Sequence, residues 1–313
     1  MISPRLVGAL GILALLTCCL TPARAQFSVQ PGSKTPVIGK DTLCFAYHLE
    51  AGDSLYFITE AIDSVIFPGA STLLKTRIEE NVVVCDSVRH DTIYYVRTWL
   101  RAAHELQTVP GTGDTVDRTS FPWVGRETYI TMTRQGKRLA IASARPNVAG
   151  TAPGGIFRPL ALPPLGGDCA RQYQSWQHLD TVVYTENAVP EGIAFTNALY
   201  RVLDFVDSNM VRYRQIQYTQ SSIASYEPQQ AGLDFTLRTV INSYGKMTFD
   251  PLRLLPIHHA ATSEQKVTIK REGNKDTEGR HLLLQHTQLV EVRSADPLRR
   301  LQRTADAVVR RPR

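Results

Sequence analysis

The chain has 313 residues, of which 43% are hydrophobic and 20% are charged, and its formal net charge is +6. This composition is ordinary for a globular protein and excludes both a disordered chain and a bundle of membrane helices. Two arginines lie in the first 25 residues, and six arginines with one aspartate lie in the last 17, so the body between them has a net charge of −1. A nearly neutral body argues against a folded nucleic-acid-binding face, and no nucleic-acid partner is expected.

Residues 1–25 have the layout of a secretory signal peptide. Arg5 supplies a positive start, Leu6–Leu20 is an apolar run, and Ala23 and Ala25 fit a small-residue cleavage site. We expect cleavage after Ala25 and export to the periplasm, the cell surface or the medium. No later stretch approaches the roughly 20 apolar residues of a transmembrane helix.

A lipid-modified Cys18 is the alternative to simple cleavage. Thr17 precedes this cysteine, whereas bacterial lipoprotein signals resemble one another in having Gly, Ala or Ser there. The competing cleavage site after Ala25 fits better. If Cys18 is modified instead, the protein is anchored to a membrane.

Strand signals dominate the mature chain and predict an all-β, antiparallel fold of half-barrel or sandwich type. The strand-like stretches are rich in β-branched and aromatic residues, and Gln135-Gly136 reads as a hairpin turn. Short helices are expected at 101–106 and 220–226. The clearest strand-like stretches are "LCFAYHLE" (43–50), "LYFITEAIDSVIF" (55–67), "NVVVCDSV" (81–88), "TIYYVRTWL" (92–100), "MVRYRQIQYT" (210–219) and "HLLLQHTQLVEV" (281–292).

A segment rich in proline and glycine, 146–169, divides the strand-rich sequence into two halves. Its apolar part, "IFRPLALPPL", is expected to pack across a sheet. The basic tail is expected to be a solvated end, with a weak contact to an anionic surface as the alternative. The predicted organisation is a signal peptide (1–25), an N-terminal extension (26–40), β-rich half 1 (41–145), the connector (146–169), β-rich half 2 (170–295) and the basic tail (296–313).

Three cysteines remain after cleavage, and an exported protein can oxidise a pair of them. Cys44 and Cys85 both lie in strand-like runs and are the predicted pair, which leaves Cys169 over. Three buried thiols are the alternative. Because the sequence contains no Cys-x-x-Cys, a redox or zinc site has no support.

The tetrapeptide Gly52-Asp53-Ser54-Leu55 matches the signature of a family of lipases and esterases, so Ser54 is a candidate nucleophile. Members of that family resemble one another in placing the serine in a βαβ arrangement and in having an Asp-x-x-His near the C-terminus. This chain has no Asp-x-x-His. Strand-like residues lie on both sides of the motif, which predicts a hairpin with its turn at Gly52-Asp53. A serine without a base is not activated, so we interpret Ser54 as structural and list no catalytic residue.

Histidines do not form a metal-binding pattern. His258 and His259 are adjacent and point to opposite faces of a strand, as do His281 and His286. No metal and no cofactor are therefore expected. Trp123, in the loop-like "SFPWVG", is the candidate ligand-binding residue, because an aromatic side chain in a loop is less needed for core packing.

Three stretches give the chain its resemblance to a known group: "YHLEAGDSLYF", "LALPPLGGDCARQYQSW" and "INSYGKMTF". With the signal peptide, they make it similar to poorly characterised exported β-rich proteins of Gram-negative bacteria. The resemblance implies an address outside the cytoplasm and no assigned activity.

The leading hypothesis is a non-enzymatic exported protein that binds a small apolar ligand or an envelope protein. One alternative is an ester hydrolase that uses Ser54. The other is an outer-membrane β-barrel, since alternating strands of about ten residues fit one, although charged faces and the arginine-rich end count against it.

Overall fold

Strands from both halves of the sequence join in one antiparallel sheet, which confirms the predicted all-β class. The computed structural model describes residues 42–295 except 70–71, 109–112, 122, 144–160, 168, 187–188, 205, 209–210, 228–234, 252, 272 and 274. The described residues contain no helix, and their strands all belong to one unit, Ile38–Arg313. The expected signal peptide, N-terminal extension and basic tail lie outside the described residues.

The main sheet has 13 strands, and its path runs β7-β6-β4-β3-β2-β15-β14-β13-β12-β10-β9, with β5 beside β4 and β11 beside β12. The pairing of β2 with β15 joins the two halves of the sequence. The strands are β2 (Ser54–Ile66), β3 (Leu73–Arg89), β4 (Ile93–Thr108), β5 (Thr115–Arg118), β6 (Thr128–Thr133), β7 (Arg138–Ser143), β9 (Ser175–Glu186), β10 (Val189–Val202), β11 (Val206–Ser208), β12 (Val211–Tyr226), β13 (Phe235–Phe249), β14 (Pro256–Arg271) and β15 (Thr277–Arg293).

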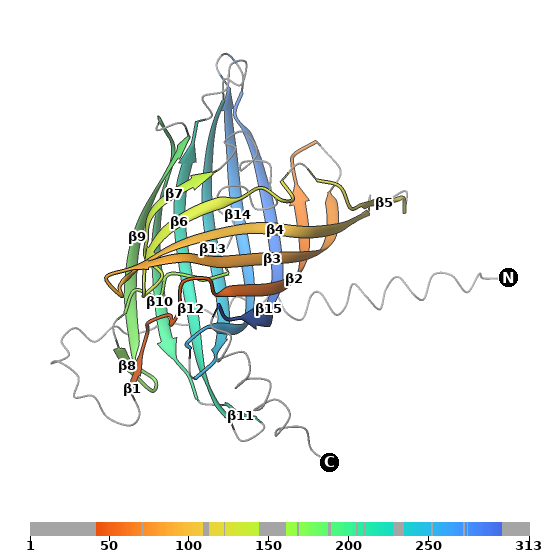
Figure 1. Ribbon diagram of the computed structural model, residues 1–313. Helices are drawn as coiled ribbons and strands as arrows, with labels where there is room; N and C mark the ends of the chain where they lie inside the picture. The colour runs from red at the N-terminus through yellow and green to blue at the C-terminus, as the bar shows by residue number, and fades with distance from the viewer. Residues whose placement is uncertain are drawn as a thin grey trace. The chain divides into compact units, whose positions relative to one another are not determined.

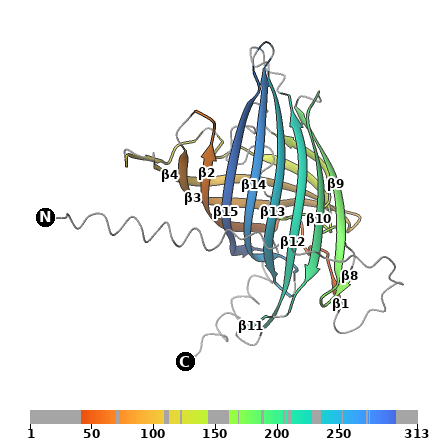
Figure 2. The ribbon, with the colours of Figure 1, turned by 180° about the vertical axis from the view of Figure 1, so that it is seen from behind.

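The sheet coils until its two ends meet, so it is nearly closed into a barrel. Strands β3 and β4 run across the direction of β9–β14, and the wall curves between them (Figures 1 and 2). At the seam, Arg138 Nη2 in β7 donates to Asp180 Oδ2 in β9 at 3.3 Å. Each half of the sequence supplies about one side of the wall.

Alternation along the strands creates an interior with two kinds of lining. In β2, Leu55 and Phe57 point inward near the start of the strand, and Thr59 and Asp63 point inward further along. Neighbouring strands follow the same division. The interior is therefore apolar at one end and polar at the other.

The apolar end is one continuous hydrophobic cluster with members from β2, β3, β4, β6, β10, β12 and β13. Phe45, Tyr47 and Leu49 add to it from the segment before β2, and Leu162 and Leu165 add to it from the connector. The expectation that the apolar part of the connector packs against the sheet is met by these two leucines.

Aromatic side chains hold the connector in place through its backbone. Residues 163 and 164 are prolines without N–H groups, but their carbonyls still need donors when they are buried. Tyr47 Oη donates to Pro163 O and Tyr200 Oη to Pro164 O, both at 2.6 Å, and Trp176 Nε1 donates to Leu165 O at 2.7 Å. Three consecutive carbonyls are thus satisfied by three aromatic donors.

The polar end contains a buried charge cluster. Arg77 Nε donates to Asp63 Oδ2 at 2.5 Å, and the same guanidinium bonds Glu79. His281 Nε2 lies 2.6 Å from the other oxygen of Asp63, and Lys75 bonds the buried Glu105 at 3.1 Å. Burial opposes the charged form of Asp63, but the bonds to His281 and Arg77 outweigh it, so the pKa of this carboxyl lies below its ordinary value.

The observed disulfide differs from the predicted pair. Cys44 bonds Cys169, and Cys85 is a buried thiol. The reason is strand pairing: β1 (Thr42–Cys44) pairs with β8 (Cys169–Arg171) and places the two cysteines opposite each other. The expected strand at 43–50 is likewise wrong beyond Cys44, because the chain there leaves the sheet and crosses the apolar end.

Of three other local predictions, the turn is confirmed and the two helices are wrong. The turn at Gln135-Gly136 is confirmed, with Gly136 at φ 78° between β6 and β7. The two expected helices are wrong, because 101–106 continues β4 and 220–226 continues β12. In both cases a long strand extends through a stretch whose sequence lacks a clear strand pattern.

Candidate functional site

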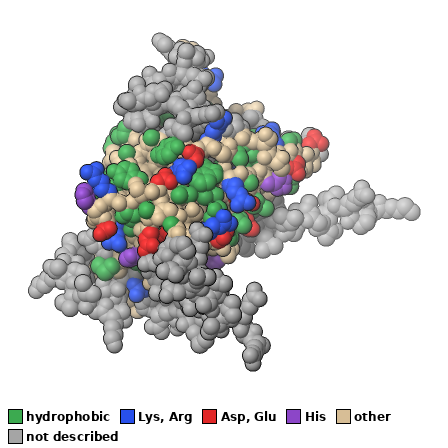
Figure 3. All heavy atoms as spheres, viewed as in Figure 1, with side chains coloured by type: hydrophobic (Ala, Val, Ile, Leu, Met, Phe, Trp, Pro, Cys, Tyr) green, Lys and Arg blue, Asp and Glu red, His purple; other side chains and the backbone are tan. Residues whose placement is uncertain are grey.

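The outer face of the sheet carries large exposed hydrophobic side chains among polar and charged ones (Figure 3). On β2, Ile62 and Ile66 point outward while Asp63 points inward. Apolar residues that face solvent in this number need an explanation. Many of these exposed apolar side chains line two hollows of the outer face.

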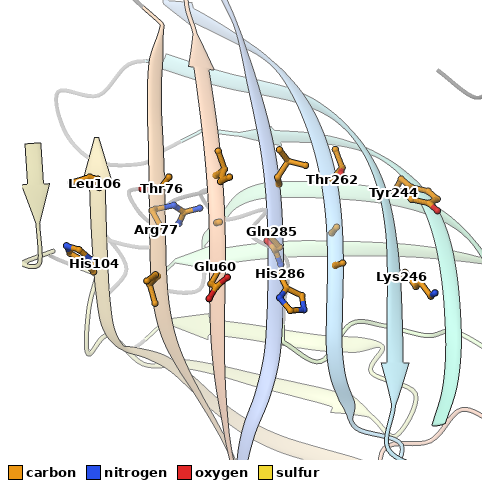
Figure 4. Close-up of a pocket in the computed structure, with 16 residues that line it drawn as sticks. Glu60, Thr76, Arg77, His104, Leu106, Tyr244, Lys246, Thr262, Gln285 and His286 are labelled. Atoms are coloured by element: carbon orange, nitrogen blue, oxygen red, sulfur yellow. The ribbon is translucent and has the colours of Figure 1, made fainter. Parts of the chain in front are cut away.

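The first hollow, which we call the β2–β15 groove, has a volume of about 750 Å³ and crosses β4, β3, β2, β15, β14 and β13 (Figure 4). At a strand spacing of about 4.8 Å, six strands give it a length of roughly 24 Å. It is therefore long enough for an extended aliphatic chain.

Cross-strand register builds the groove from two neighbouring rows of outward side chains. The uncharged row follows paired positions on the six strands, and the second, titratable row follows the positions two residues away on each strand. The uncharged row is Leu106, Thr76, Ile62, Leu284, Thr262 and Tyr244, and the titratable row is His104, Ile78, Glu60, His286, Ala260 and Lys246.

Small side chains give the groove its depth at β14. Thr262 lies there between Leu284 on β15 and Tyr244 on β13, and Ala260 is its neighbour in the second row. Leu284 and Tyr244 are each 51% exposed. Two large side chains thus flank a strand of small ones, and an apolar chain laid across β14 contacts both.

The titratable row gives one side of the groove a mixed charge. Glu60 and His286 face each other across β2 and β15, and the His286 ring stacks on His258 with 5.8 Å between centroids. His104 Nε2 lies 2.7 Å from Asp117 Oδ1 on β5. A ligand with a charged end therefore meets charged side chains along this side of the groove.

The groove contains no recognisable catalytic set. Activation of a nucleophile requires a hydroxyl or thiol held against a base, and its described lining offers hydroxyls without such a hydrogen bond. Among the described residues, no group of three or more His, Cys, Asp and Glu side chains could hold a metal ion. The arrangement is suited to binding.

Ser54 lies at the start of β2, six residues or roughly 20 Å from the groove at Glu60. Gly52 before it has φ 85°, and Asp53 Oδ2 accepts hydrogen bonds from the Glu50 N–H and from Arg253, both at 3.1 Å. The turn predicted at Gly52-Asp53 is present, although it does not close the predicted hairpin. These contacts are those of an Asp-stabilised turn.

Trp123 lies between β5 and β6 and contacts Phe121 with its ring tilted by 32° and 4.7 Å between the ring centroids. Next to it, Val124 bridges to Leu100 of β4. Within the described part of the chain, the buried Trp123 Nε1 has no hydrogen-bond partner. Neither Trp123 nor Ser54 lines the β2–β15 groove.

Sequence reasoning missed the groove because its rows run across strands that are far apart in sequence. One local signal was available. The stretch "EAIDSVIF" has apolar residues in both alternation phases, so one set had to face outward.

Comparisons with known proteins found no matching family model and no matching curated sequence. A putative exported protein with a YmcC-like fold from Bacteroides fragilis is 10% identical, with a TM-score of 0.26, over 80% of this chain and 100% of that chain. An outer membrane channel from Pseudomonas putida F1 is 9% identical (TM-score 0.24; 82% and 100% covered), and Pseudomonas aeruginosa OccK5 is 10% identical (TM-score 0.22; 79% and 100%). Likeness at TM-scores this low carries no argument about function.

One further observation bears on location. The Cys44–Cys169 disulfide is typical of proteins in an oxidising compartment. In the part of the chain that the structure describes, no helix is long and apolar enough to span a membrane.

Proposed function

We propose that the protein is a non-enzymatic binding protein of the cell envelope that holds an apolar chain in the β2–β15 groove. The observation that carries the proposal is the uncharged row of six paired positions, all of which line a hollow of about 750 Å³. Burial of apolar surface is the main favourable term in binding such a ligand.

The charge distribution supports an apolar chain in this groove and not inside the barrel. The polar end of the interior contains the buried charges of Asp63, Arg77 and Glu79, which are already bonded to one another. An apolar ligand there would separate paired charges or leave them desolvated, at a cost of several kcal/mol. The outer groove imposes no such cost.

The test uses a long-chain alcohol with a photoreactive diazirine on its tail, cross-linked to the mature protein and mapped by mass spectrometry. We expect labelled peptides from β2 and β15. Leu284→Asp places a charge in the uncharged row of the groove and should reduce this labelling at least about tenfold, since burying an unpaired charge costs more than 1.4 kcal/mol.

Leu139→Asp is the matched control. Leu139 on β7 is 52% exposed, against 51% for Leu284, and lies outside the groove. Equal losses of labelling in the two variants, or wild-type labels away from β2 and β15, would refute the proposal. A native mass above the denatured mass by a few hundred daltons would identify a co-purified ligand directly.

The two alternatives from the sequence have their own tests. Charged side chains, among them Glu60, Lys246 and Lys266, occur in several outward-facing rows of the sheet. In a membrane barrel, each such charge facing lipid near the midplane costs about 2–4 kcal/mol. We therefore expect extraction into aqueous buffer without detergent; a requirement for detergent would favour the membrane barrel. Any ester hydrolysis should persist in Ser54→Ala, and its loss would favour the hydrolase.

A further inference from the structure

The second hollow of the outer face, which we call the β10–β15 groove, has a volume of about 910 Å³. It lies over β10, β12, β13, β14 and β15 and reaches Ile66 at the end of β2. None of its lining residues belongs to the β2–β15 groove.

Apolar side chains line one end of this groove. Phe195, Ile223 and Val240 are paired neighbours on β10, β12 and β13. Phe195 is 53% exposed and Ile223 is 62% exposed. Ile193 continues the apolar surface one row further along β10.

Positive side chains lie over β13, β14 and β15, and Ile66 on β2 follows them in the row. Lys266 on β14 continues the same row after Val240, and Arg280 on β15 lies directly opposite Lys266. Arg238 on β13 is outward in the adjacent row. Like charges directly opposite each other across a sheet destabilise it, so this placement has a cost that the fold alone does not explain.

The cations are only partly neutralised within the protein. Arg280 Nε bonds Glu264 Oε1 at 2.8 Å. Among the ion pairs of the described residues, none involves Lys266 or Arg238, and Glu278 is the one acid among the described residues that line the groove.

We propose that the β10–β15 groove binds a single anionic amphiphile, with its aliphatic chain on Phe195 and Ile223 and its anionic head at Lys266 and Arg238. The apolar side chains on β10 and β12 are separated from the cationic side chains on β13 and β14, and this orients the ligand because each group matches one part of such a molecule. This inference stands apart from the proposed function of the β2–β15 groove, since the two share no residue.

The experiment is calorimetric titration of the mature protein with dodecyl phosphate and with uncharged dodecyl maltoside, both below micelle formation. We expect dodecyl phosphate to bind more tightly. Lys266→Gln should weaken dodecyl phosphate about fivefold, on the order of one exposed ion pair, and leave dodecyl maltoside unchanged. Glu278→Gln should strengthen dodecyl phosphate by removing a repulsive charge.

Lys137→Gln is the matched control, because it removes the same charge from an exposed position between β6 and β7 that lines neither groove. It should leave dodecyl phosphate binding unchanged. Ile223→Asp should weaken both ligands at least tenfold if the chain lies on the apolar end.

Three titration results would overturn the proposal: equal affinity for the two head groups, equal effects of Lys137→Gln and Lys266→Gln, or full affinity in Ile223→Asp. A vesicle arm separates a single amphiphile from a membrane surface. Sedimentation with phosphatidylglycerol vesicles without binding of monomeric dodecyl phosphate would also overturn it.

Discussion

Arg138 in β7 donates a hydrogen bond to Asp180 in β9 over 3.3 Å, and the pair thereby links the first and last strands of the sheet path. The Asp180 side chain is fully buried, and that of Arg138 is 14% exposed. A buried carboxylate that loses its cation keeps its desolvation cost. The contact at the seam therefore depends on both partners.

Replacing Arg138 should weaken the contact at the seam and measurably lower the free energy of unfolding. We expect Arg138→Met to lower the free energy of unfolding by about 3 kcal/mol, because Asp180 is left buried without its cation. Urea unfolding followed by far-UV circular dichroism measures this change. Arg101→Met is the control, since its pair with Glu80 is exposed on both sides and should contribute less than about 1 kcal/mol. Similar losses in the two variants would contradict a special role for the seam.

Gly245 in β13 makes room for an aromatic ladder inside the barrel. A Cβ at this position would lie 2.5 Å from the ring of Tyr218. The ring can therefore lie over β13 and reach His259, with 5.7 Å between ring centroids, while its other side faces Tyr200 at 5.9 Å. Only glycine permits this close approach.

Gly245→Ala should accordingly destabilise the fold by about 1–3 kcal/mol, the usual cost of overpacking. In a Tyr218→Leu background the same substitution should cost little, since the clashing ring is gone. A double-mutant cycle of unfolding free energies gives the coupling directly. A coupling near zero would mean that Gly245 is needed for the backbone and not for Tyr218.

The strand class was predictable from the sequence because β-branched and aromatic residues fill most of the strands. The turn at Gly136 was predictable because glycine accepts its positive φ at no cost. Packing of the connector was predictable from its apolar residues, of which Leu162 and Leu165 are buried. In each case the signal lies within a few neighbouring residues.

Pairing between strands that are distant in sequence could not be predicted from such local signals. Cys44 lies opposite Cys169 because β1 pairs with β8, and nothing near Cys44 in sequence specifies that partner. The inward position of Asp63 could not be predicted either, because its neutralising partners Arg77 and His281 belong to other strands. The two grooves depend on cross-strand register, so their positions could not be predicted from the sequence for the same reason.

A buried histidine should make stability depend on pH. Tyr218 Oη and His259 Nε2 are 2.8 Å apart. Burial raises the pKa of Tyr218, so its hydroxyl donates to a neutral imidazole. Burial, with the charge of His286 as a lesser cause, lowers the pKa of His259 from 6.5 to about 4.

The sign follows from proton binding. Between pH 6.5 and about 4 the unfolded chain binds a proton at His259 that the folded chain does not, so the free energy of unfolding falls as the pH falls. The loss should reach roughly 3 kcal/mol near pH 4. In His259→Gln, which keeps an acceptor for Tyr218, this part of the pH dependence should disappear. Parallel curves of stability against pH for the two proteins would show that His259 titrates normally.

The Cys44–Cys169 disulfide encloses most of the first half of the sequence, since its cysteines are 125 residues apart. In the chain-entropy model, a loop of this length stabilises the fold by about 5 kcal/mol. Cys44→Ser should therefore lower the midpoint of urea unfolding strongly, and a reducing agent should have no further effect on that variant.

Cys85 provides the internal control. Burial, followed by the charges of Asp53 and Asp86, raises the pKa of its thiol to about 12, and a protonated, buried thiol reacts slowly. Iodoacetamide should label Cys44 and Cys169 after reduction of the folded protein, and Cys85 only after unfolding. Labelling of Cys169 without reduction, together with protection of Cys44 and Cys85, would instead support the pairing first expected from the sequence and would require β1 to leave β8.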